Sequence, residues 1–252
     1  MAEHKFPSEV IDLPSEGKLY PKGHPLKDGK IEIKYMTARE EDILTSQNLI
    51  KKGVVIDKLI NSLILTEGVS GDDLLIGDKN AVMVAARVLA YGPEYVCDIK
   101  NPNTNETISH TFNLADCPFK KLPSDIDYST NEFEFELPVS KVKLKWKLLT
   151  GIDDEQIQSE LNAKKKLGSL QSSAITTRLK RIIVDWNGDT DKSTLSENIE
   201  NMLSKDSLAL RNEITRISPD VEMKQDIEFP EGGTVEVDIP LTVNFFWPES
   251  AG

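Results

Sequence analysis

The chain has 252 residues, of which 38% are hydrophobic and 29% are charged, and its formal net charge is −12. This balance is typical of a folded protein with one large core or two small ones, not of a disordered or fibrous chain. The longest apolar stretch, 81–90, is interrupted by Arg87 and is much shorter than the roughly 20 residues that span a bilayer. We therefore expect no membrane insertion. The net charge of −12 also disfavours general nucleic-acid binding, because such binding requires an excess of Lys and Arg to neutralise phosphates.

The first residues, MAEHKFPSEV, lack the apolar segment of an export signal, so we expect the protein in the cytosol of the cell that makes it. In that compartment Cys97 and Cys117 are expected to be reduced thiols.

Residues 1–30 are predicted to form an extended amino-terminal arm, because 12–26 concentrates three prolines and two glycines. Proline restricts the backbone and lowers the entropy lost on docking. The arm can accordingly be interpreted as a segment that docks on a neighbouring protein. The alternative interpretation is that it packs on its own domain. The residues expected to contact a partner in the first case are Leu13, Pro14, Leu19, Tyr20 and Pro21.

Residues 31–92 are predicted to contain a short strand followed by helices. Thr37 and Glu40 have the spacing of a capping box, which predicts a helix from Ala38. A second helix follows Gly53, and a third is expected to be capped by Asp78 and to end at Gly92. The third helix is apolar nearly all round, so we expect it to be buried between other elements.

Residues 93–150 show the period-two alternation of two antiparallel hairpins. The first has strands at 94–100 and 106–114, joined by the turn-forming sequence NPNTN. In the second, EFEFEL alternates glutamates with apolar residues and VKLKW alternates lysines with apolar residues, so the charges should pair on the outer face. The polar segment 122–130 is expected to be a surface connection.

Residues 151–219 are predicted to form a block of three or four helices, the first capped by Asp153 and another running through 175–186. Residues 220–252 return to strands at 221–229 and 235–248, joined by the turn PEGGT. The predicted fold class is α+β, with a helical body, antiparallel hairpins and the extended arm.

Motifs of catalysis are absent from the sequence. There is no glycine-rich phosphate loop and no GxSxG elbow. The three histidines, His4, His24 and His110, fall in the arm or within a predicted strand. The basic runs KKKL (164–167) and RLKR (178–181) are expected to be solvated helix faces. We predict no catalytic residues, no cofactor and no small-molecule substrate.

Acidic pairs and cysteines leave two alternatives open. The pairs at 40–41, 72–73 and 153–154 fall at predicted helix starts, where carboxylates stabilise the helix dipole. The alternative is a metal-dependent hydrolase that uses these carboxylates. A zinc site from Cys97, His110 and Cys117 is the other alternative, but the sequence has no Cys-x2-Cys pair. We predict no metal site.

Four motifs carry a resemblance to a known family: LPSEGKLYP, KIEIKYMTAREEDIL, LLIGDKNAVMVAARVLAYGPEY and FFWP. In this order they resemble the baseplate hub family of T4-like contractile-tailed bacteriophages. The resemblance covers the first half of the chain well, the final strand modestly and 153–217 poorly. Many members of that family carry a cysteine-rich ribbon after the Tyr-Gly-x-x-Tyr segment, where this chain has only Cys97.

The resemblance implies a non-enzymatic structural or assembly role, in which the protein binds other baseplate hub or tail proteins of the phage. It implies a location in the host cytoplasm during assembly and then in the tail baseplate of the virion. A transient, chaperone-like factor that leaves the finished particle is the alternative.

Overall fold

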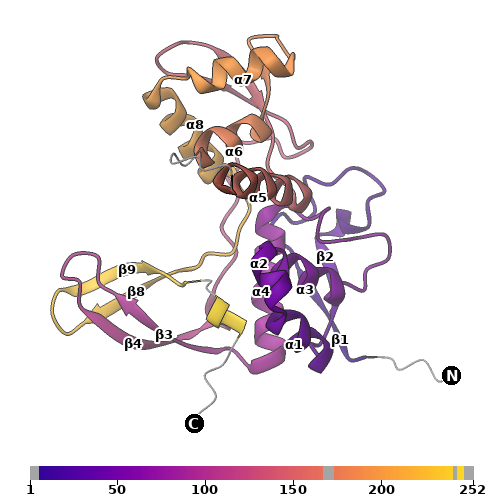
Figure 1. Cartoon of the computed structure of the whole chain (residues 1–252), viewed down its shortest axis with the longest axis vertical. Coiled ribbons are helices and arrows are strands. Elements are labelled where there is room, and N and C mark those ends of the chain that lie inside the picture. Colours follow the sequence, from indigo (N-terminus) through magenta and orange to yellow (C-terminus); the bar gives the residue numbers. More distant parts are fainter. Residues whose placement is uncertain (1–5, 167–172, 241–242, 247–252) are drawn as a thin grey trace.

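The computed structural model describes residues 6–166, 173–240 and 243–246. These contain eight α-helices and nine strands, and the strands form small antiparallel sheets, so the predicted α+β class is confirmed (Figure 1). No helix among the described residues is long and apolar enough to cross a membrane.

The amino-terminal part combines one strand pair with four helices. Its elements are β1 (Ser8–Asp12), the 3-10 turn η1 (Pro25–Asp28), β2 (Lys30–Lys34), α1 (Ala38–Thr45), α2 (Gln47–Lys52), α3 (Val55–Leu63) and α4 (Ile76–Tyr91). Helix α1 begins at Ala38 with the predicted capping box: the Glu40 carboxylate accepts hydrogen bonds from the Thr37 backbone N–H (2.9 Å) and hydroxyl (2.6 Å). Strand β1, paired with β2, was not predicted in the arm.

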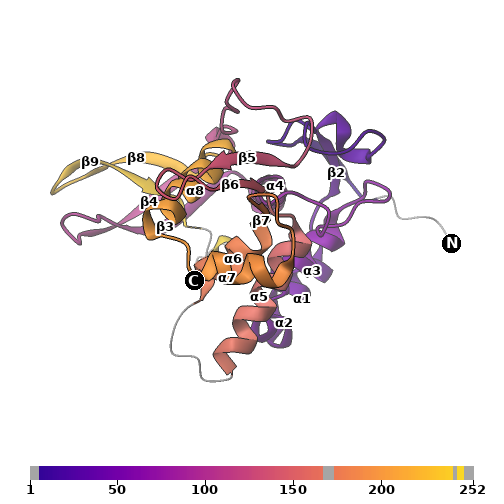
Figure 2. The same cartoon turned by 90° about the horizontal axis from the view of Figure 1, so that it is seen from above.

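Two hairpins project from the body beside each other (Figures 1 and 2). They are β3 (Glu94–Lys100) with β4 (Thr107–Asn113), and β8 (Lys224–Phe229) with β9 (Gly233–Asp238). Both turns are the predicted ones. The strand expected over 235–248 is too long, because β9 ends at Asp238 and Val243–Phe246 form the 3-10 turn η3.

The remaining elements form a three-stranded sheet with four helices. They are β5 (Phe133–Glu136), β6 (Lys143–Trp146), α5 (Gly151–Lys166), α6 (Ala174–Ile182), β7 (Ile183–Trp186), α7 (Lys192–Glu200) and α8 (Ser204–Ile217). The predicted charge pairing is confirmed, since Glu134 lies opposite Lys145 and Glu136 opposite Lys143. The helix predicted through 175–186 is wrong at its end, because the chain leaves α6 at Ile182 and pairs with β6 as β7.

Segment 122–130 is more buried than predicted. Tyr128 is buried against Phe133, and its hydroxyl donates to the Ile217 carbonyl at 2.9 Å. This bond attaches the connection to the end of α8.

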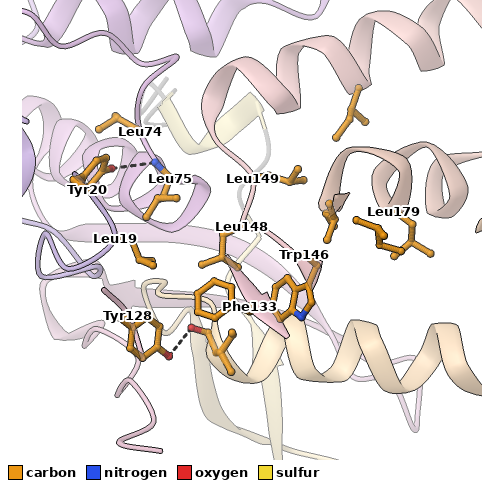
Figure 3. Close-up of a cluster of buried hydrophobic side chains, with 14 of the residues drawn as sticks. Leu19, Tyr20, Leu74, Leu75, Tyr128, Phe133, Trp146, Leu148, Leu149 and Leu179 are labelled. Carbon is orange, nitrogen blue, oxygen red and sulfur yellow. Dashed lines mark hydrogen bonds between the residues drawn. The ribbon is translucent and has the colours of Figure 1, made fainter. Parts of the chain in front are cut away.

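Buried apolar side chains form two clusters. We call the first the arm core, in which Leu13, Leu19 and Tyr20 join side chains from β2, α3, α4 and the whole β5–α8 part. Figure 3 shows part of it, with Leu19 and Tyr20 of the arm near Leu74, Leu75 and Leu148. We call the second the hairpin core, which joins α1, α3 and α4 to both projecting hairpins and to Phe245 and Phe246. Helix α4 contributes to both, with Val82 in the first and Val84 in the second. Its predicted burial between other elements is thus confirmed.

Candidate functional site: the arm on helix α4

The predicted anchors of the arm lie in this chain's own core. Leu13, Leu19 and Tyr20 are 1%, 6% and 5% exposed and belong to the arm core. Pro14 is also buried, whereas Pro21 is exposed. The structure therefore has the arrangement of the second interpretation, in which the arm packs on its own domain, and four of the five anchors are covered by that packing.

A tight turn brings the arm back toward β2. Glu16 and Gly17 both have positive φ, 51° and 71°. A Cβ on Gly17 would lie 2.2 Å from the Lys27 carbonyl oxygen, so only glycine allows this approach. The Lys27 ammonium donates to the carbonyls of Lys18 (3.0 Å) and Tyr20 (2.9 Å), which closes the turn.

Asp78, at the start of α4, is the polar attachment point of the arm. Its Oδ1 accepts the Ser15 backbone N–H at 2.9 Å, and its Oδ2 accepts the hydroxyls of Ser15 and Tyr20, both at 2.7 Å. The Tyr20 hydroxyl in turn accepts the backbone N–H of Leu75 at 3.1 Å (Figure 3). Asp78 and Ser15 are fully buried, so the arm satisfies a carboxylate that has no access to water.

Burial dominates the protonation of this network. It raises the pKa of Asp78, although hydrogen bonds from Ser15 and Tyr20 favour the ionised form and oppose the shift. Burial, with the nearby Asp78 carboxyl as second cause, also raises the pKa of the Tyr20 phenol well above its ordinary value. The raised pKa keeps the Tyr20 phenol protonated near neutral pH, as its hydrogen bond to Asp78 requires.

The predicted capping role of Asp78 is wrong. Helix α4 begins at Ile76 with Leu75 at the N-cap, so Asp78 is the third helical residue and its carboxylate accepts from the arm instead of from its own helix. The helix predicted from Asp153 likewise begins earlier, at Gly151, and Asp153 accepts from the Thr150 backbone N–H (3.2 Å) and from Lys147 (2.6 Å).

Helix α4 also contacts the segment that follows α8. A Cβ on Gly77 would lie 1.8 Å from the Pro219 carbonyl oxygen, so the glycine allows the chain after α8 to cross the helix. Asn80 donates to the Asp220 carboxylate at 2.9 Å in the same crossing. Thus α4 holds both the arm and the connection between the β5–α8 part and the second projecting hairpin.

Arg87, on the other half of α4, holds the carboxy-terminal segment. Only 3% exposed, it donates to the carbonyls of Phe245 (2.7 Å), Gly92 (2.9 Å) and Glu94 (3.1 Å). The predicted end of α4 at Gly92, with φ of 85°, is confirmed. Sequence reasoning missed Arg87 as a site residue, although a single charge within the apolar stretch 81–90 was a visible signal.

The other residues considered for chemistry are dispersed. His110 lies across from Cys97 in the first projecting hairpin, and His24 is stacked on Tyr20. Cys117 faces Gln225 of β8. His4 lies outside the described residues. Among the residues that the structure describes, no group of three or more His, Cys, Asp and Glu side chains could hold a metal ion.

The acidic pairs also serve local structure. Glu40 and Glu41 lie in the first turn of α1, and Asp153 and Asp154 lie in the first turn of α5, as predicted. The pair at 72–73 instead lies in the turn before α4, where Asp73 accepts the Ser70 N–H and hydroxyl at 2.8 Å.

A comparison with protein families matches residues 7–247 to the family described as T4 bacteriophage base plate protein. The chain belongs to this family. No curated protein and no solved structure matched the chain. The predicted resemblance to T4-like baseplate proteins is thus confirmed, and the match includes the helical part that the motifs covered poorly.

The base plate motifs noted in the sequence correspond to the contacts of α4. LPSEGKLYP supplies Ser15 and Tyr20, and LLIGDKNAVMVAARVLAYGPEY supplies Asp78 and Arg87. The described part of FFWP supplies Phe245, the acceptor of Arg87. Residues from three of the four motifs that carry the resemblance therefore meet in space along α4.

Proposed function

We propose that this base plate protein is a non-enzymatic structural component of the baseplate hub, and that it binds other hub or tail proteins of the same phage. The observation that carries the proposal is the family match over nearly the whole chain. We place the protein in the host cytoplasm during assembly and in the tail baseplate afterwards.

The use of the buried charged groups supports a scaffold rather than a catalyst. Glu40 binds Lys34 and Thr37, and Asp206 accepts the backbone N–H groups of Val139 and Ser140. Asp78 and Arg87 are engaged in the contacts described above. A buried acid or base that served catalysis would face a cleft and a substrate, whereas these groups attach one segment of the chain to another.

The exposed part of the arm is the place we propose for its contact with a partner. Leu13, Pro14, Leu19 and Tyr20 are covered by this chain, whereas residues 21–23 are exposed. Pro21 restricts the backbone there, so docking of this short segment costs little entropy.

Mass spectrometry of purified virions, combined with crosslinking in infected cells, tests the proposal. A structural component is expected in the particles and crosslinked to other baseplate proteins, with Lys22 as the reactive lysine of the exposed arm segment and the exposed Lys205 on α8 as the matched control. Crosslinks in infected cells without retention in virions would make the protein a transient assembly factor. No link to tail proteins in either sample would overturn the proposal.

A further inference from the structure

A groove lies between the start of α3 and helix α5. Its volume is about 500 Å³, and its walls are the turn that joins α2 to α3 and one face of α5. The walls approach closely, since a Cβ on Gly53 would lie 3.8 Å from the Asn162 Nδ2 atom. Figures 1 and 2 both show α5 beside α2 and α3. We call this cavity the lysine groove, because its lining includes Lys51, Lys52, Lys165 and Lys166.

The charge of the lysine groove is opposite to that of the whole chain. Acidic residues outnumber Lys and Arg by 42 to 30 in the sequence, whereas the groove has four lysines and only two carboxylates, Asp57 and Glu155. Lys79 already binds Asp57. All four groove lysines are exposed, and none of them forms an ion pair within the part of the chain that the structure describes. These four cationic groups are therefore available to an anionic occupant.

Lysines in the last turn of a helix also stabilise the helix dipole. That role explains lysines at the end of α2 or at the end of α5. It does not require that the two helix ends meet across one cavity, nor that α5 line this cavity with the polar side chains of Gln158, Ser159 and Asn162. The convergence of both lysine pairs on a groove with further hydrogen-bonding groups is typical of a binding surface.

We propose that the lysine groove binds an acidic segment of a partner protein, whose Asp or Glu side chains pair with the four lysines. Charge complementarity selects this occupant, and Gln158, Ser159 and Asn162 can hydrogen-bond to its backbone. The groove contains no residue of the arm, so this contact is additional to the one proposed for residues 21–23 and does not depend on it.

Other anionic occupants fit the charges less well. A second copy is disfavoured, because two chains of net charge −12 repel each other. A nucleic acid carries phosphates along its whole length, so it would also meet the acidic surface outside the groove. A partner protein needs to be acidic only in the short segment that enters the groove.

Fluorescence anisotropy of a labelled decaglutamate peptide, titrated with the full chain, tests the groove. We expect binding that weakens with salt. Lys165→Gln with Lys166→Gln should weaken it by about fivefold, as the loss of two exposed ion pairs allows. Lys51→Gln with Lys52→Gln, on the opposite wall, should have a similar effect. Neither pair of substitutions should change thermal unfolding much, since all four lysines are exposed.

Lys121→Gln with Lys205→Gln is the matched control. It removes two exposed lysines outside the groove and changes the net charge by the same amount, so it should alter binding by less than about twofold. No binding of the peptide, an equal loss in the control, or tighter binding of duplex DNA than of the peptide would overturn the proposal.

Carbodiimide crosslinking in infected cells identifies the natural occupant, because this reagent joins a lysine amine to a carboxylate in direct contact. We expect links from the groove lysines to Asp or Glu residues of another protein. Links only to this chain's own sequence, or none in complexes that contain the protein, would overturn the proposal. Absence of the protein from tail complexes would instead contradict the proposed function, and the peptide titration would still decide whether the groove binds acidic segments.

Discussion

The arm core and the hairpin core share α4 but are stabilised differently. In the arm core, a buried carboxylate, Asp78, accepts hydrogen bonds from a segment about 60 residues earlier in the chain. In the hairpin core, aromatic side chains pack edge to face, as Phe245 does with Tyr95 and Phe246, and the buried charge is the cation of Arg87. The comparison shows that the two halves of one helix attach distant segments with charges of opposite sign.

The two cores also differ in how far apart in the sequence the residues that determine them lie. The projecting hairpins are specified by their own turns and alternation, which are local in the sequence. The arm has no such independent pattern, and its turn is useful only when Asp78 and the apolar groups of α3 and α4 are in place. The arm core should therefore be the more sensitive of the two to the loss of a single segment.

Deletion of residues 1–26 is the largest test of this difference. The deletion would remove, among other buried groups, the core side chains of Leu13, Leu19, Tyr20 and Leu26. Each contributes about 1.5–3 kcal/mol on burial, which together approaches the whole stability of about 5–15 kcal/mol typical of a domain. We expect an unfolded or aggregating product, as measured by circular dichroism and limited proteolysis. A truncated protein that melts cooperatively like the full chain would show that the arm is dispensable for folding.

Arg87→Ala tests the hairpin core. Three carbonyl acceptors would lose their donor, and the loss of stability should be about 3 kcal/mol. Amide exchange should increase first in β3 and η3, whose backbone carbonyls Arg87 binds. Arg39→Ala, at an exposed position of α1, is the control and should change stability by less than about 0.5 kcal/mol. Equal effects of the two substitutions would contradict a specific role for Arg87.

Tyr20→Phe removes one hydroxyl from the arm core while the ring remains. Asp78 would lose a donor and the Leu75 N–H its acceptor, so we expect a loss of about 2 kcal/mol in chemical denaturation. Tyr91→Phe provides a matched control, because its hydroxyl bonds to Glu41 at an exposed position. If both variants lose the same stability, the buried network has no special contribution.

The sequence predicted well the features that neighbouring residues encode. The turn PEGGT, the pairing of glutamates on β5 with lysines on β6, and the helix start after Thr37 all depend on contacts within one hairpin or one turn. Strand β7 was missed because its apolar run IIVDW fits a buried helix as well as a strand, although the following Asn187 and Gly188, both with positive φ, form a typical turn.

The candidate site was only half predictable. The composition of the arm identified Leu13, Leu19 and Tyr20 as apolar anchors, but not the surface they cover. That surface depends on the pairing of β1 with β2 and on the partners of Asp78, which lie at least 58 residues from it in sequence. A carboxylate near a helix start suggests a cap, and no local pattern distinguishes a cap from an acceptor for a distant segment.

The pH dependence of stability should differ between two buried carboxylates. Burial alone would raise the pKa of Glu40, but hydrogen bonds from Lys34 and Thr37 lower it overall. Its contribution is therefore present above the ordinary Glu value of about 4.3 and is lost as pH falls through the lowered folded value. The raised pKa of Asp78 has the opposite sign, and its contribution is lost as pH rises from about 3.9 through the folded value.

Unfolding free energies of the wild type, Glu40→Gln and Asp78→Asn from pH 3 to 7 check these signs. The difference between wild type and Glu40→Gln should shrink below pH 4, and that between wild type and Asp78→Asn should move in the opposite direction as pH rises. Each group can contribute no more than about 1.4 kcal/mol per pH unit. Parallel curves for all three proteins would contradict both assignments.

Replacement of the cysteines should have the smallest effect, and it tests whether the hairpin core depends on anything besides packing. Cys97 and Cys117 are half-buried free thiols, and burial raises the pKa of both. A thiol with a raised pKa is a poorer metal ligand and a poorer nucleophile near neutral pH, because the thiolate is the reactive form. Each therefore acts as a small apolar side chain, and Cys97→Ala or Cys117→Ala should cost less than about 1 kcal/mol. Thermal unfolding with elemental analysis checks this. Stoichiometric zinc that disappears on substitution of Cys97, accompanied by unfolding of the hairpins, would mean that a metal stabilises the hairpin core.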